Sequence, residues 1–167
     1  AAAAGGTNPV LVLDAGSAVF TTALFPALVR STVLQSSADG VSMALAYDAT
    51  ATESAYFNIP LSTMVSAVSS ASIDLWISAT SSGGTVWQIG TVFFLTGSSG
   101  GGASTAVSST SAVSISGTVT RVNVALAGSS WSPPGMLQVR IGRFPSDAGD
   151  VNTGDVYLHN AALRITV

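Results

Sequence analysis

Five charged residues gather around the turn sequence Pro-Ser-Asp-Ala-Gly near the C-terminal end of the chain. They are Arg140, Arg143, Asp147, Asp150 and Asp155. Three carboxylates within nine positions could supply oxygen ligands to Ca²⁺. The spacing is not that of an EF-hand loop, however, and the two arginines disfavour a divalent cation. An arginine fork instead matches a carboxylate bidentately.

We therefore predict that these residues form a structural loop latch. In this latch Arg143 pairs with Asp150 or Asp155, because its planar guanidinium can clamp two segments of a loop. Asp147 accepts hydrogen bonds from backbone amides in its own turn. Calcium is the alternative occupant of this loop, and no cofactor is expected.

A second pattern, Gly97-Ser-Ser-Gly-Gly, matches the G-x-S-x-G nucleophile elbow with Ser99 in the serine position. The loop aspartates and then His159 follow in the order of a hydrolase triad. The elbow needs a helix directly after its serine, and the sequence Gly102-Ala-Ser-Thr has no helical pattern. A chain with 26 serines and 17 glycines produces such a match by chance. We expect no catalysis, and a packed or interface role for His159, the only histidine.

Three tryptophans could form a stacking platform for sugars, as in a carbohydrate-binding module. Trp87 lies inside an apolar run and is expected in the core. Trp76 falls on the polar side of an alternating run, where it either packs under another layer or is exposed. Trp131 precedes Pro133-Pro134 in a predicted loop, and it is the best candidate for an exposed contact. For the three together, core or subunit-interface positions are favoured over sugar binding.

The elements that must position these residues are strands, because apolar and polar residues alternate with a period of two. Half-buried strands are predicted at residues 41–47, 73–78, 121–126 and 137–141. Denser apolar runs at 86–95 and 156–167 predict strands covered on both faces, and residues 10–13 predict a short strand. The Ser, Gly and Ala stretch at 96–111 predicts a long connection, and residues 60–68 could hold one helical turn. About eight strands at this spacing indicate an all-β sandwich.

Composition excludes several function classes. Charged residues make up 8% of the 167 residues, against about 25% in ordinary soluble domains. The net charge of −3 and the lack of any basic cluster argue against nucleic-acid binding. The longest apolar run, at residues 18–29, is broken by two threonines and a proline, so no membrane-spanning helix is predicted. Cysteine and lysine are both absent, which excludes disulfides and a phosphate-binding P-loop.

Several segments recur in the order seen in one family of proteins. These are Asp48-Ala-Thr-Ala-Thr-Glu-Ser-Ala-Tyr-Phe, Ile73-Asp-Leu-Trp-Ile-Ser-Ala, Ser82-Gly-Gly-Thr-Val-Trp-Gln, Leu137-Gln-Val-Arg-Ile-Gly-Arg-Phe-Pro-Ser-Asp-Ala-Gly-Asp and Thr153-Gly-Asp-Val-Tyr-Leu. Together they resemble the jelly-roll module of tailed-bacteriophage virion proteins, found in head decoration proteins and at tail-fibre tips. The resemblance covers about residues 41–167, and its most specific part is the loop from Arg143 to Asp155. The connection at residues 97–103 and the N-terminal arm depart from the family pattern.

This resemblance implies an antiparallel jelly-roll β-sandwich of about eight strands, a homotrimer, a place on the virion and no enzymatic activity. We expect an extended arm at residues 1–9 and a single jelly-roll domain at residues 10–167. The expected function is that of a capsid decoration (cement) protein, which binds its own copies and the major capsid protein on the outer surface of the phage head. The alternative is a tail-fibre or receptor-binding tip module that binds a glycan receptor.

Overall fold

The computed structural model describes residues 10–13, 18, 26–30, 43–61, 67–95, 97, 103–128 and 131–167. Within these ranges the chain is all β, and none of its residues is helical. The twelve strands are β1 (Val10–Leu13), β2 (Ala27–Arg30), β3 (Met43–Tyr47), β4 (Glu53–Leu61), β5 (Ser70–Ala79), β6 (Gly83–Thr85), β7 (Trp87–Leu95), β8 (Ala103–Ser109), β9 (Val113–Ile115), β10 (Thr120–Ala125), β11 (Gly135–Arg143) and β12 (Val156–Thr166). The described residues contain no helix that could span a membrane. The arm predicted at residues 1–9 and most of the helical turn predicted at 60–68 lie outside these ranges.

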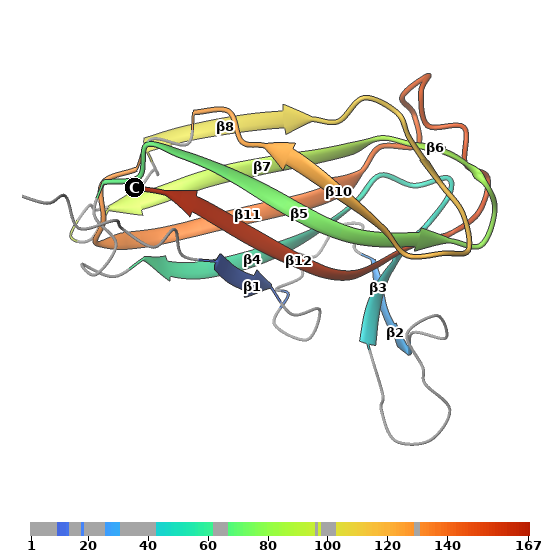
Figure 1. The fold of residues 1–167 in the computed structure, drawn as a ribbon, viewed down its shortest axis with the longest axis horizontal. Helices are drawn as coiled ribbons and strands as arrows, with labels where there is room; N and C mark the ends of the chain where they lie inside the picture. The colour runs from blue at the N-terminus through green and yellow to red at the C-terminus, as the bar shows by residue number, and fades with distance from the viewer. Residues whose placement is uncertain are drawn as a thin grey trace, which may run out of the picture.

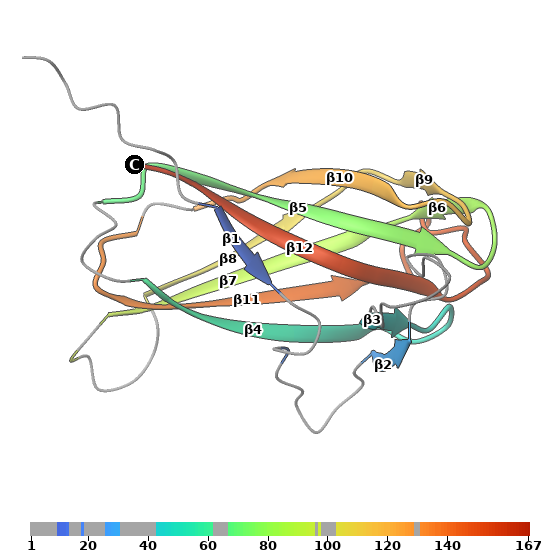
Figure 2. The ribbon, with the colours of Figure 1, turned by 60° about the horizontal axis from the view of Figure 1, so that its bottom comes forward.

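Two antiparallel sheets pack face to face, as Figures 1 and 2 show. One sheet has the order β10-β5-β12-β3-β2, with β1 also paired to β12, and the other has the order β4-β11-β7-β8. The paths β10-β5-β12-β3 and β4-β11-β7-β8 give the strand order of an eight-stranded jelly roll. The predicted jelly-roll β-sandwich is therefore confirmed. The short strands β1, β2, β6 and β9 are additions to it, and β6 pairs with β9 in a small separate ladder.

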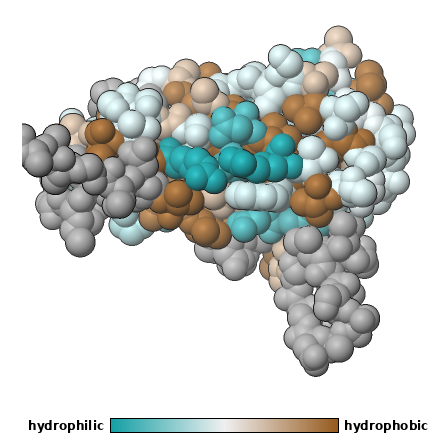
Figure 3. Space-filling model, in the orientation of Figure 1, coloured by the Kyte–Doolittle hydropathy of each residue, from teal (hydrophilic) through white to brown (hydrophobic). Residues whose placement is uncertain are grey.

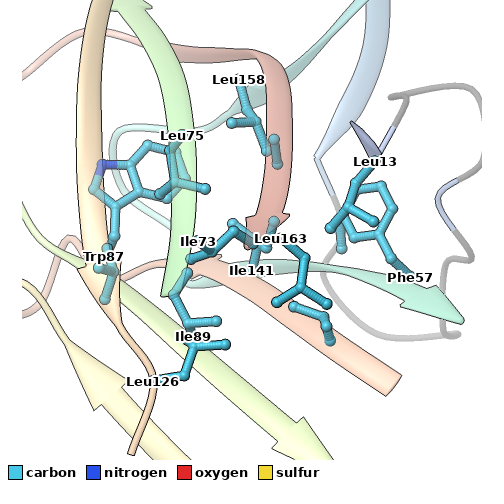
Figure 4. Close-up of a cluster of buried hydrophobic side chains, with 14 of the residues drawn as sticks. Leu13, Phe57, Ile73, Leu75, Trp87, Ile89, Leu126, Ile141, Leu158 and Leu163 are labelled. Carbon is cyan, nitrogen blue, oxygen red and sulfur yellow. The ribbon is translucent and has the colours of Figure 1, made fainter. Parts of the chain in front are cut away.

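The core lies between the two sheets and follows from the alternation in the sequence. Alternate residues of β5 (71–79), β11 (137–141) and β4 (55–61) are apolar and buried, which removes one face of each strand from water. Figure 4 shows side chains from both sheets converging in this layer. Its largest member is Trp87, whose ring meets the ring of Tyr47 edge-on with centroids 5.1 Å apart. The prediction that Trp87 is a core residue is confirmed.

A β-bulge at His159 explains the dense apolar run at the end of the chain. The register of β12 against β5 shifts between Leu158 and Asn160, so one residue of β12 is left over. Because side chains alternate along a strand, this extra residue changes which positions face the core. Leu158 is buried before the bulge, and Leu163 and Ile165 are buried after it. The apolar run therefore contains two sets of core-facing residues, one before His159 and one after it.

Two sequence predictions are corrected by the fold. The stretch at residues 96–111 is not only a connection, because β8 forms within it by pairing with β7. Pairing with a neighbour, and not apolar alternation, specifies this strand of serine, threonine and alanine. The run at 86–95 was expected to be covered on both faces, but the outward residues Gln88, Val92 and Phe94 of β7 are only partly buried. The outer face of the four-stranded sheet is therefore available for contact along β7.

Candidate functional site

Arg143, the last residue of β11, is fully buried and is the centre of the predicted loop latch. Its Nε and Nη2 atoms donate to the two carboxylate oxygens of Asp150 at 3.1 and 2.9 Å. The other donors bind the backbone carbonyl oxygens of Asn152 (2.5 Å), Gly154 (2.8 Å) and Asp48 (3.2 Å). All five N–H donors of the guanidinium are therefore used. One side chain ties the loop after β11 to the turn between β3 and β4.

The remaining loop residues have unequal parts in this latch. The Asp147 carboxylate accepts from the amide of Gly149 at 2.8 Å, inside its own turn. The Asp150 carboxylate also accepts from the amide of Val86 at 3.1 Å, which joins the loop to the start of β7. Asp155 is exposed, and its backbone carbonyl, rather than its carboxylate, accepts a bond from Thr80. Of the two partners predicted for Arg143, Asp150 is the one that forms the ion pair, and the Asp155 carboxylate is not in contact with the guanidinium.

Sequence reasoning missed Asn152 as a member of the latch. Its side-chain amide donates to the carbonyl of Ser81 at 2.8 Å, and its amide oxygen accepts from the Ser81 hydroxyl at 2.7 Å. The side chain is buried and holds the β5–β6 turn against the loop. The described residues contain no group of three or more His, Asp or Glu side chains that could hold a metal ion. The geometry of this loop is that of a structural clamp.

A second charged cluster lies on the outer face of the six-stranded sheet. Asp74 of β5 accepts two bonds from Arg121 of β10, at 2.8 and 2.9 Å, and one from Arg164 of β12 at 2.5 Å. Asn123 donates to the same carboxylate at 2.9 Å. Burial would raise the pKa of Asp74, but these hydrogen bonds outweigh it and lower the pKa. Figure 3 shows a hydrophilic strip where these three strands run side by side.

A serine–histidine contact lies farther along the same face. The Ser78 hydroxyl and Nε2 of His159 are 2.8 Å apart, and both residues are buried. Burial lowers the pKa of His159, which favours the neutral imidazole. The ring lies 6.4 Å from that of Tyr157, centroid to centroid. The pair was not predicted, since a bulge places the imidazole on this face. Ser99, the serine of the elbow pattern, lies outside the described residues.

The outer face of the four-stranded sheet contains a hollow, which we call the Gly90 hollow. Its floor is the row formed by Tyr56 of β4, Arg140 of β11, Gly90 of β7 and Val107 of β8, which are register partners in that order. Gly90 supplies no side chain, so the surface is lowered at that point. The hollow encloses about 170 Å³ and is lined by Tyr56, Gly90, Val92, Val107, Gln138 and Arg140.

Arg140 lies across the floor of the Gly90 hollow. A Cβ atom added to Gly90 would lie 3.2 Å from Arg140 Nε, which shows how closely the guanidinium covers the glycine backbone. The guanidinium carbon is also 6.0 Å from the ring centroid of Phe144. Arg140 Nε is buried and has no hydrogen-bond partner, and Arg140 forms no ion pair with the residues that the structure describes. This differs from Arg121, Arg143 and Arg164, which all pair with aspartates.

The prediction that Trp131 is an exposed contact was wrong. Its side chain is only 3% exposed, and its ring stacks on that of Phe93 with centroids 6.4 Å apart. Its backbone pairs with that of Val68, with an amide-to-carbonyl distance of 2.8 Å. This pairing closes one end of the sandwich over the core, which explains why a loop tryptophan is buried. Trp76 is half-buried on the outer face of the six-stranded sheet.

Strand β1 presents apolar side chains to solvent. It pairs with β12 on one edge, and no other strand that the structure describes pairs with it. Leu13 points into the core, whereas Val10 and Val12 are 48% and 66% exposed. Figure 3 shows apolar surface at this position, below the hydrophilic strip. This exposed apolar edge was not predicted, because the sequence alone does not show which strand lies next to β1.

Comparison with known proteins gives little more. No family model matches the sequence, and no curated protein matches it. Among solved structures, a similar one is the carbohydrate-binding module TmCBM61 in complex with beta-1,4-galactotriose, with a TM-score of 0.43 and 12% sequence identity. The match covers 93% of this chain and 88% of that chain. A likeness at this level does not decide the function.

Proposed function

We propose that this chain is a non-enzymatic bacteriophage virion protein that decorates the outside of the head as a homotrimer and stabilises the shell. The observation that carries the proposal is the apolar edge of β1, where two valines are exposed and with which no described strand other than β12 pairs. An exposed edge strand has unpaired backbone donors and acceptors, and exposed valines add apolar area, so such an edge favours association with another chain. The sequence resemblance described above and the jelly-roll architecture, which viral capsid domains also use, support the same assignment.

The mechanism is mechanical stabilisation by binding. A rigid sandwich that contacts neighbouring copies of the major capsid protein makes those contacts only with the assembled shell. Its binding free energy is therefore added to the shell and not to free subunits, and mass action shifts the equilibrium toward assembly. The low charge content of the chain suits this role, since the centres of protein interfaces are depleted of charged residues.

A glycan-binding tip module on the tail is a second candidate function. The Gly90 hollow favours it, because a small concavity with an aromatic ring and unpaired polar groups is suited to a ligand. Trp131, the candidate for an exposed aromatic contact with a glycan, does not support this function because its side chain is buried. The two functions differ in the surface they use, β1 for decoration and the Gly90 hollow for glycans.

A matched pair of variants tests the role of β1 in decoration. Val12 and Val151 are exposed to the same degree, 66% and 65%, but Val151 lies in the latch loop away from β1. We expect Val12→Lys to weaken co-sedimentation with undecorated capsids at least about tenfold, since a charge would be buried in the contact. Val151→Lys should bind as the unmodified protein does. Equal binding by both variants would exclude the β1 edge as the contact.

Imaging of complete particles separates the two candidate functions. Averaged cryo-electron microscopy density that fits three copies of this chain as a knob on the capsid surface is the expected result. Density at the tail tip alone would reject decoration and favour the tip module. Sedimentation equilibrium of the purified protein then reports whether the trimer exists before it binds the capsid.

A further inference from the structure

The Gly90 hollow carries an inference that is independent of the β1 edge. Among the arginines whose side chains the structure describes, Arg140 alone has no carboxylate partner. Its Nε donor is buried without a hydrogen-bond acceptor. A buried donor without an acceptor is unfavourable, and a turn of the guanidinium that brings this donor to a bound anionic oxygen would remove that cost. The position therefore suits a ligand that has a carboxylate, which an arginine fork can bind through two parallel hydrogen bonds.

The other lining groups of the hollow restrict the rest of the ligand. Tyr56, Val92 and Val107 supply aromatic and aliphatic surface beside the guanidinium. Gln138 also lines the hollow, and its amide nitrogen donates to the amide oxygen of Asn58 at 3.1 Å, so two side-chain amides lie together at one rim. A sugar ring fits this combination, since its C–H face is apolar and its hydroxyl groups can both donate and accept. A simple anion without a sugar ring would contact Arg140 and leave the other lining groups without a partner.

The size of the hollow points to a single small residue. Its volume is about 170 Å³, whereas pockets for drug-sized ligands hold about 300–1,000 Å³. We propose that the Gly90 hollow binds one carboxylate-bearing sugar residue, such as a uronic or sialic acid, of a larger acidic glycan. The carboxylate pairs with Arg140, the ring lies against Tyr56 and the two valines, and the hydroxyl groups meet the Gln138 and Asn58 amides.

The Nε–H signal of Arg140 in a ¹⁵N-resolved NMR spectrum tests this proposal directly. The signal is identified as the one that disappears in Arg140→Lys. We expect glucuronate to shift this signal in a saturable way. Glucose and acetate should each bind at least about tenfold more weakly, because glucose lacks the carboxylate and acetate lacks the sugar ring. Acetate as tight as glucuronate would mean that the hollow binds simple anions. A short peptide that binds through its terminal carboxylate as tightly as glucuronate would also overturn the proposal.

Variants separate binding in the hollow from effects on the fold. Arg140→Lys keeps the charge but loses the fork, and Gly90→Ala places a methyl group against the guanidinium; each should weaken glucuronate binding at least about tenfold. Arg121→Gln removes one positive charge from the opposite face of the sandwich and should bind as the unmodified protein does. Melting temperatures measured for all three variants show whether each one is folded. Binding that survives both hollow variants would exclude the site, while capsid binding through β1 could still hold.

Discussion

Arg143 joins three separate segments through five hydrogen bonds, so its contribution to stability rests on the shape of the guanidinium as well as its charge. A lysine keeps the charge but cannot reach two carboxylate oxygens and three carbonyl groups at once. We expect Arg143→Lys to lower the free energy of unfolding by about 3 kcal/mol, as for other broken buried pairs. Chemical denaturation measures the change.

The control for this change is Arg121→Lys, which alters an ion pair that is half exposed to solvent. Exposed pairs contribute about 0–1 kcal/mol, so its effect should be far smaller. Equal effects of the two substitutions would contradict the latch as a dominant element of stability. Both arginines pair with one aspartate, but only Arg143 is buried and also binds three carbonyl groups, so the comparison measures what these two features add.

His159 makes the stability of the domain depend on pH near neutrality. Its pKa in the folded protein is lowered from 6.5 by burial, so the unfolded chain binds more protons as the pH falls through 6.5. Stability should therefore decrease between pH 7.5 and pH 5.5, with a slope of at most about 1.4 kcal/mol per pH unit. Urea unfolding at several pH values measures it.

The variant His159→Gln provides the control, because glutamine can still hydrogen-bond Ser78 but does not titrate. Its stability should lack the decrease toward pH 5.5. Asp48 and Asp74 have pKa values lowered from 3.8, so they titrate below this range. Burial raises the pKa of Glu53, and its protonation favours the folded protein as the pH falls, so the difference between the two proteins isolates the opposite effect of His159. An unmodified protein that becomes more stable toward pH 5.5 would contradict a neutral buried imidazole.

The start of β11 leaves no room for a side chain. Its first residue, Gly135, pairs with Leu61 of β4 and Leu95 of β7. A Cβ atom there would lie 2.5 Å from both the Phe93 ring and the carbonyl oxygen of Phe94. We expect Gly135→Ala to destabilise the protein by about 2 kcal/mol, as overpacking generally does. Thermal unfolding monitored by circular dichroism measures the shift.

The matched control is Gly117→Ala, because a Cβ atom at Gly117 would meet nothing within 4 Å. Its effect should stay within about 0.5 kcal/mol. If both alanine variants melt at the same temperature as the unmodified protein, the end of the sheet near Gly135 must be able to move apart. Such a result would show that close packing at this position is not needed for the fold.

The sequence predicts some elements well and others poorly, for a physical reason. β5, β10 and β11 each have one core face and one outer face, so apolar and polar residues alternate along them. β8 has no such pattern, because its serine, threonine and alanine residues form a strand only by pairing with β7. In the latch, the pairing of Arg143 with Asp150 can be predicted from the sequence, because a buried arginine needs a carboxylate partner. The three carbonyl acceptors carry no sequence signal.

The Gly90 hollow could not be predicted from the sequence at all. Its residues come from four strands, and only the register of β4, β11, β7 and β8 places them in adjacent rows. The burial of Trp131 depends likewise on a pairing with Val68, more than sixty positions earlier in the chain. Sites built across sheet strands depend on contacts between distant residues, which one sequence does not reveal.

At the scale of the whole molecule, the last strand completes the fold. β12 lies between β5 on one side and β1 and β3 on the other, and it contributes Leu158, Leu163 and Ile165 to the core. We expect a chain that ends at Asp155 to lack cooperative thermal unfolding, because the six-stranded sheet would lose its central strand. Removal of Val167 alone, which follows β12, should leave the melting temperature unchanged.

Circular dichroism melts of the two shortened chains give the measurement. A truncated chain that still unfolds cooperatively would show that β3 and β5 can close the sheet without β12. The expected loss also means that folding must wait for pairings between residues far apart in the sequence. Folds of this kind typically form in about milliseconds to seconds.

The pairing of β1 with β12 has a mechanical consequence. The strands are antiparallel, and Val10 lies opposite Arg164, so the outer ends of both strands leave the sandwich side by side. A force that pulls these two ends apart acts along the ladder hydrogen bonds and breaks them one pair at a time, beginning at Val10. Peeling of this kind resists much less force than shearing a whole ladder at once. A particle that held this module by the outer ends of β1 and β12 would load this ladder one pair at a time, whereas one that held it by a sheet face would not.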